Sequence, residues 1–126
     1  MNSVRSSILI LILLFMSACA HSSEEVKRDA WMNKMSATLP SVFCLGGQFF
    51  RECFEVSRGE CEQAAAFAVR ACLQKYKDQI PKVLIQPKDG GHWGKIIDDC
   101  TVQACEKNLQ KKRINNTKCN DPNNWR

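Results

Sequence analysis

The stretch SRGECEQAAAFAVRAC, residues 57–72, decides the fold of this 126-residue chain. Ser57 and Glu60 have the spacing of a capping box, in which an N-cap serine and a glutamate three residues later satisfy each other's backbone N–H groups. The alanines that follow favour a helix, which we expect from about Arg58 to Gln79. Small residues recur along one face of this helix, namely Cys61, Ala65, Ala68, Val69 and Cys72. This stripe allows a partner helix to approach closely.

The cysteine spacing suggests what that partner is. Cys44 and Cys53 are nine residues apart, and Cys61 and Cys72 are eleven apart, which corresponds to about 13 and 16 Å along two helices. If each pair lies on its own helix, two antiparallel helices place Cys53 opposite Cys61 near the turn and Cys44 opposite Cys72 at the far end, so we expect a helical hairpin stapled at both ends. The predicted bridges are Cys53–Cys61, Cys44–Cys72, and Cys119 with Cys100 or Cys105.

Seven cysteines follow Cys19, and in a small exported domain that density indicates a disulfide framework. They are Cys44, Cys53, Cys61, Cys72, Cys100, Cys105 and Cys119. A zinc site would need paired short spacings such as C-x2-C, and neither these nor the C-x-x-C-H of a c-type haem occurs. We therefore expect no metal and no cofactor. Because seven is odd, at least one thiol stays free, pairs with another chain or is buried and inert.

The rest of the chain is predicted to be mostly helical. A first helix lies within Ser22–Met35 and stops at Leu39-Pro40, and a last helix covers Lys95–Arg113. Pro81–Trp93 connects the central helix to the last one, and the C-terminal segment is coil pinned by Cys119, with Trp125 folding back. No segment alternates strictly between apolar and polar residues, so a substantial sheet is not expected. The fold class is all-α: a small disulfide-stapled domain of three to four helices with a central α-hairpin.

The N-terminus has the features of an export signal. Arg5 precedes an uncharged run from Ile8 to Met16, too short to span a bilayer comfortably. Two cleavage patterns compete at its end. Ala18-Cys19-Ala20 fits cleavage after Ala20 and release of a soluble protein, whereas Met16-Ser17-Ala18-Cys19 resembles the lipobox of bacterial lipoproteins. That resemblance implies an acylated Cys19, although leucine is usual where Met16 stands.

These features divide the chain into three parts. Residues 1–18 are the signal peptide, residues 19–35 are a lipid-anchored tether with a first helix, and residues 36–126 are the disulfide-rich helical domain. The net charge is mild, with 18 Lys and Arg against 13 Asp and Glu. The one basic cluster, Lys111–Arg113, is most simply a solvated helix end, with anionic lipid as the alternative partner. We expect no nucleic-acid partner, which would require a denser basic patch.

The stretch from Lys88 to Lys95 is the most unusual part of the sequence. It combines glycines with His92, Trp93 and Lys95, which we treat as a candidate partner surface on a flexible loop; the simpler interpretation is a turn into the last helix with Trp93 packed on the hairpin. Asp98 could orient His92 as a base, but no recognised motif places a nucleophile beside it. Four phenylalanines are expected in the core: Phe49, Phe50, Phe54 and Phe67.

The sequence favours a non-enzymatic role in the bacterial cell envelope. The expected protein is a lipoprotein anchored through Cys19 to the inner or outer membrane and facing the periplasm. There it would bind another envelope protein as an accessory or structural subunit, as secretion-system components and pilot-type lipoproteins do. The alternative is a secreted or periplasmic inhibitor or immunity protein that blocks a toxin or hydrolase.

Overall fold

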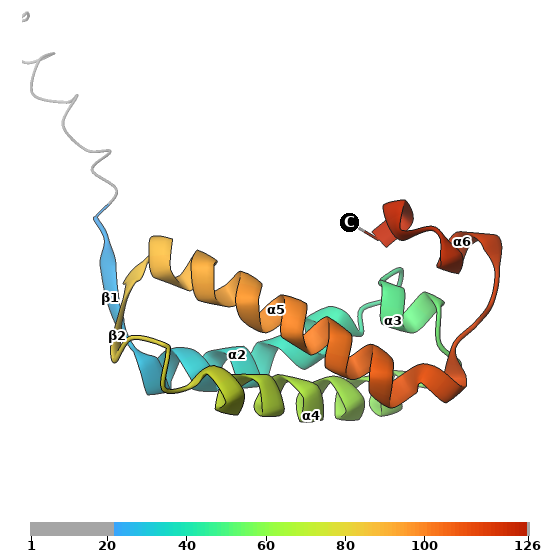
Figure 1. Ribbon diagram of the computed structural model, residues 1–126, viewed down its shortest axis with the longest axis horizontal. Coiled ribbons are helices and arrows are strands. Elements are labelled where there is room, and N and C mark those ends of the chain that lie inside the picture. Colours follow the sequence, from blue (N-terminus) through green and yellow to red (C-terminus); the bar gives the residue numbers. More distant parts are fainter. Residues whose placement is uncertain (1–21, 126) are drawn as a thin grey trace, which may run out of the picture.

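The computed structural model describes residues 22–125, which form three long helices with short elements at both ends (Figure 1). The elements in chain order are β1 (Glu24–Lys27), α2 (Arg28–Phe43), α3 (Phe49–Glu52), α4 (Arg58–Tyr76), β2 (Val83–Gln86), α5 (Lys88–Leu109) and α6 (Thr117–Asn120). Single 3-10 turns follow α5 and α6, at Gln110–Lys112 and Pro122–Trp125. The two strands pair at one end of the helices, and α3 and α6 lie at the other (Figure 1).

Helix α4 is the central element, because α2 packs on one side of it and α5 on another. Its predicted capping box is confirmed: the Ser57 N–H donates to Glu60 Oε2 at 2.8 Å, and the Glu60 N–H donates to Ser57 Oγ at 3.2 Å. The predicted stripe of small residues is fully buried. The domain is therefore small, mostly helical and stapled by disulfides, as the sequence predicts, with one minor two-stranded sheet.

The cap also makes the fold sensitive to acid. Hydrogen bonds from the Ser57 backbone and from the Lys112 ammonium lower the pKa of Glu60 from its ordinary 4.5 to about 2. A carboxylate with a lowered pKa contributes stability that is complete above its unfolded pKa and is lost as the pH falls toward the folded value. We expect Glu60→Gln to lower the melting temperature at pH 7 and to flatten its decline between pH 4.5 and 2.

The measurement is thermal unfolding followed by circular dichroism across that pH range. Glu62→Gln is the matched control, because Glu62 pairs with Arg58 on the same helix and makes no capping contact. It should keep the acid sensitivity of the parent protein. A Glu60→Gln variant that declines as steeply as the parent would contradict the role given to the cap.

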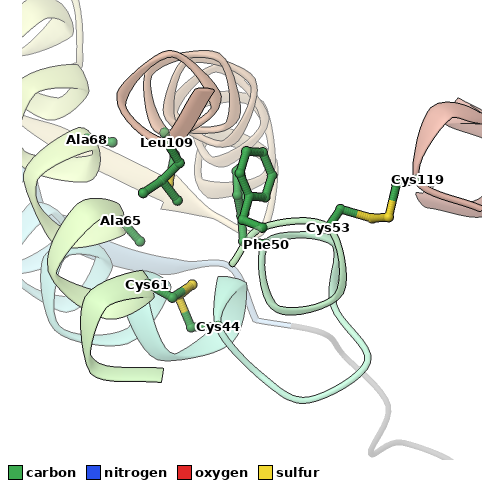
Figure 2. Close-up of a cluster of buried hydrophobic side chains, with 10 residues drawn as sticks. Cys44, Phe50, Cys53, Cys61, Ala65, Ala68, Leu109 and Cys119 are labelled. Carbon is green, nitrogen blue, oxygen red and sulfur yellow. A yellow bond between two sulfur atoms is a disulfide. The ribbon is translucent and has the colours of Figure 1, made fainter. Parts of the chain in front are cut away.

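The disulfide framework is present, but the predicted pairing is wrong. The structure joins Cys44 to Cys61, Cys53 to Cys119, and Cys72 to Cys100. The predicted hairpin partner does not exist as a long helix, since α3 is only four residues long. The hairpin is instead formed by α2 and α4, and Cys44, directly after α2, faces the start of α4 (Figure 2). The other two long helices, α2 and α5, are thus each bridged to α4 once.

Cys105 is the unpaired cysteine among the described residues. It lies on α5 and is completely buried. Burial raises the pKa of this thiol to about 11, so it stays protonated and unreactive at neutral pH. Of the three outcomes that the odd count allows, a buried and inert thiol is the one that the structure contains.

The first predicted helix is displaced along the chain. Residues 24–27 form β1, which pairs antiparallel with β2 so that Val26 lies opposite Leu84. Helix α2 begins only at Arg28 and continues through Pro40 to Phe43, and the domain boundary placed between residues 35 and 36 therefore falls inside it. Pro40 removes one backbone N–H, yet the last turn is held by Phe43, which packs against both core clusters, and by the adjoining Cys44 bridge.

The connector predicted before the last helix is also shorter than expected. Helix α5 begins at Lys88, so Gly90, Gly91 and Gly94 are helical. The Asp89 carboxylate accepts the backbone N–H of Ile85 at 2.7 Å, which fixes the first turn against β2. A Cβ at Gly90 would meet only the flexible end of the Gln86 side chain, which could move aside. These glycines therefore lie in the first turns of a helix rather than in the flexible loop that the sequence suggested.

The core has two parts. One lies between α2, α4, α5 and β2 around Trp31 and Ile97, and the other gathers Phe50 and Phe54 with the cysteines of α3 and α6. Phe49 is half-buried, but Phe67 is 62% exposed on the outer face of α4, and its predicted core position is wrong. The predicted signal peptide and Cys19 lie outside the described residues. Within residues 22–125, no helix combines the length and hydrophobicity that crossing a membrane requires.

Candidate functional site

The predicted partner surface lies on the first turns of α5, near the paired strands. His92 and Lys95 are exposed. Trp93 is half-buried against the core cluster around Trp31, in line with the simpler interpretation, and its ring contacts the His92 ring. Lys95 forms an ion pair with Asp99 at 2.8 Å. The loop predicted for these residues is wrong, and their role as a partner surface stays a prediction.

A second candidate site lies at the opposite end of the domain. It is a groove of about 530 Å³ between the end of α2, α3, the middle of α5 and the C-terminal segment. Its walls are mostly apolar, and their aliphatic and aromatic side chains are Val42, Phe43, Phe49, Phe50, Val102, Pro122 and Trp125. Val42, at the rim, is 51% exposed although it is aliphatic. A groove of this size and lining is typical of a ligand or peptide site. We call it the C-terminal groove.

Phe50 and its neighbours form the floor of the C-terminal groove. Phe50 is 2% exposed, and its ring lies edge-on to Phe43 and Phe49 at centroid distances of 6.1 and 5.3 Å. Figure 2 shows its ring pointing from the short helix α3 toward α5. Aromatic pairs in this geometry contribute beyond their buried area. The floor is therefore a preformed aromatic surface.

The C-terminal segment supplies the outer wall, and a disulfide fastens it. The bridge from Cys53 to Cys119 joins the residue after α3 to α6 (Figure 2). Trp125 then folds back as predicted, with its ring 5.4 Å from that of Phe49 and its indole N–H donating to the Lys118 carbonyl at 3.2 Å. Without this bridge, only a few polar contacts and ring contacts would hold the segment in place.

Arg113 links the floor to this wall. Its guanidinium lies over the rings of Phe49 and Phe54, 4.7 and 5.3 Å from their centroids, and donates to the Cys119 carbonyl at 2.7 Å. Lys112, its neighbour, forms an ion pair with Glu60 at 2.9 Å. Two of the three residues in the predicted basic cluster are therefore engaged within the domain rather than free at a solvated helix end.

The groove also contains two acidic side chains on α5. Asp98, Val102 and Glu106 follow one another at intervals of four residues and form one stripe along the wall. Both carboxylates are half-buried, and neither belongs to the ion pairs or side-chain hydrogen bonds of residues 22–125. Burial raises the pKa of Asp98, and the nearby Asp99 carboxylate adds to the effect. The groove thus holds negative charge that the described fold leaves unpaired.

Sequence reasoning missed this site for a physical reason. The spacing of Asp98, Val102 and Glu106 is visible in the sequence, but a last helix that begins at Lys95 puts Asp98 in its first turn, whereas α5 begins seven residues earlier, at Lys88. The groove itself forms only when segments far apart in the sequence meet, such as α3 and the residues around Trp125. In the part of the chain that the structure describes, no three His, Cys, Asp or Glu side chains gather in a way that could hold a metal ion.

Comparison with known proteins gives one match. A family model described as T2SS substrate NttA matches residues 25–113. This range covers the strands and the long helices but ends at Arg113, so Cys119 and Trp125 lie beyond it. Searches of the curated proteins and of the solved structures found no match.

Proposed function

The chain belongs to the NttA family of type II secretion substrates, and from this membership we propose that it is exported as a soluble, non-enzymatic binding protein. It acts outside the cell that makes it and recognises its partner in the C-terminal groove. The observation that carries the proposal is the groove itself, an apolar and aromatic surface whose outer wall is fastened by the Cys53–Cys119 bridge. Disulfides persist in exported proteins, so both lines of support agree.

The placement of the acidic side chains favours binding over catalysis. Asp98 and Glu106 are eight residues apart on α5, which is about 12 Å along the helix axis. Carboxylate pairs that cleave a glycosidic bond work at separations of roughly 5–10 Å. Widely spaced charges beside an apolar wall suit recognition of an extended surface, and this supports a non-enzymatic role.

Export is tested by locating the protein in a bacterial host with and without a working type II secretion system. We expect the intact protein in the medium of the competent host, beginning at His21 and without added acyl mass. In the deficient host it should stay in the cells. A chain that begins at an acylated Cys19 and remains in the membranes of both hosts would contradict the proposal and favour a lipid-anchored accessory protein of the envelope.

The binding role is tested with Nile red, an uncharged dye that fluoresces in apolar sites. We expect one dye molecule per protein and a dissociation constant at least about tenfold higher for Val102→Trp, because the larger side chain fills the groove. Phe67→Ala is the matched control, since Phe67 is an exposed aromatic side chain on α4, outside the groove. Equal dye binding by Val102→Trp and the parent would overturn the assignment of the groove.

A further inference from the structure

We propose that the C-terminal groove binds a cationic peptide segment of its partner, in which two basic residues flank an apolar one. The inference rests on the proposed function and adds the chemistry of the ligand. Its basis is the stripe of Asp98, Val102 and Glu106, which presents negative charge, an aliphatic surface and negative charge in succession along α5.

The ion pairs within residues 22–125 use acidic side chains outside the groove. Five acidic side chains of residues 22–125 form ion pairs, namely Asp29, Glu52, Glu60, Glu62 and Asp99. Asp99, next to Asp98 in sequence, is paired with Lys95 and does not line the groove. Asp98 and Glu106 line the groove instead, and neither belongs to an ion pair within residues 22–125. The groove is therefore negative although the chain as a whole is positive.

Among the residues of 22–125 that line the groove, Arg113 is the one cation, and it is already engaged in other contacts. Arg113 stacks on Phe49 and Phe54 and donates to the Cys119 carbonyl, so it holds the wall together rather than neutralising the carboxylates. Asp98 lies in surroundings that raise its pKa, which means that its charged form is poorly solvated. A cationic ligand group would relieve this cost, and the aromatic rings nearby also attract cations.

The spacing sets the form of the peptide. The two carboxylates are about 12 Å apart along the helix axis, and two residues four positions apart in an extended peptide are about 13 Å apart. A segment such as KALAK places one lysine at each carboxylate. Its central leucine then lies against Val102 and the aromatic floor.

The test is a titration of the oxidised, isotope-labelled protein with capped peptides, followed by NMR of the tryptophan indole N–H groups. Trp125 lines the groove, whereas Trp31 and Trp93 lie in the other core cluster and serve as internal references. We expect KALAK to move the Trp125 signal saturably and to bind about tenfold more tightly than QALAQ. EALAE should bind more weakly still, and added salt should reduce the difference between KALAK and QALAQ.

Variants of the acidic side chains test whether the charges in the groove cause the preference for KALAK. Asp98→Asn combined with Glu106→Gln should bring the affinities for KALAK and QALAQ within about twofold of each other. Asp99→Asn, which removes one charge from α5 outside the groove, should retain the preference. Loss of the preference in both variants, or in neither, would overturn the proposal.

Other outcomes identify what has failed. If QALAQ binds as tightly as KALAK while Nile red still binds, the groove is a binding site but not for cations, and the inference alone fails. If neither peptide moves Trp125 and Val102→Trp leaves dye binding unchanged, the proposed function fails too. A Trp125 shift that depends on protein concentration without peptide would assign the groove to a second copy of the chain and overturn the proposal.

Discussion

Replacing Cys53 and Cys119 together by alanine is expected to lower the free energy of unfolding by about 4 kcal/mol. The two cysteines are 66 residues apart, and a cross-link over a loop of that length restricts the unfolded chain strongly. The loss is large against the roughly 5–15 kcal/mol by which small domains are stable. It should also release the outer wall of the groove, so that Nile red binding falls with stability.

The measurement is urea unfolding followed by circular dichroism, and Cys105→Ala is the control. That variant removes a buried sulfur but no cross-link, and we expect it to cost only about 1 kcal/mol. Removal of the Cys44–Cys61 bridge, with a separation of 17 residues, should cost about 3 kcal/mol. A Cys53/Cys119 variant as stable as Cys105→Ala would show that the bridge does not hold the segment as described.

Phe50→Ala is expected to lower the free energy of unfolding by about 3–5 kcal/mol. Phe50 is 2% exposed and contacts the rings of Phe43, Phe49 and Phe54. Truncation removes this contact area and leaves a cavity beneath the groove, which the surrounding rings can fill only in part. Chemical unfolding in urea measures the loss, and a retained slope of free energy against urea would show that the two-state transition is intact.

Phe67→Ala provides the matched comparison, because it deletes the same side chain from an exposed site on α4. We expect a change within about 0.5 kcal/mol. The sequence predicted both phenylalanines in the core, whereas the structure buries only Phe50, so the difference between the two variants tests this burial. Similar losses at the two positions would contradict the burial that separates them.

Local signals in the sequence predicted the centre of the fold well. The capping box at Ser57 and the small-residue stripe from Cys61 to Cys72 depend on contacts within one helix or along one face of it. For that reason they could be recognised without knowledge of the partner helices. Pinning of the C-terminal segment by Cys119, and the return of Trp125, also followed from the sequence.

The errors arose where distant segments decide the local structure. Residues 24–27 form a strand only because residues 83–86 pair with them. Gly90 and Gly91 indicated a loop, whereas both lie in α5, whose first turn is fixed against β2 by the Asp89 carboxylate. The predicted disulfide pairing was wrong because it assumed one helix that carries both Cys44 and Cys53. Cys44 instead follows α2, and Cys53 follows the short helix α3 and bonds to Cys119. The groove also depends on this bridge, because it forms between α3, α5 and the C-terminal segment that Cys119 fastens.

The most direct test of the central claim, an exported binding protein whose groove is closed by a disulfide, is non-reducing peptide mapping of the protein recovered from the culture medium. The account predicts linked peptides for Cys44–Cys61, Cys53–Cys119 and Cys72–Cys100, with Cys105 as a free thiol. Recovery of Cys119 as a free thiol, or linked to a cysteine other than Cys53, would contradict it.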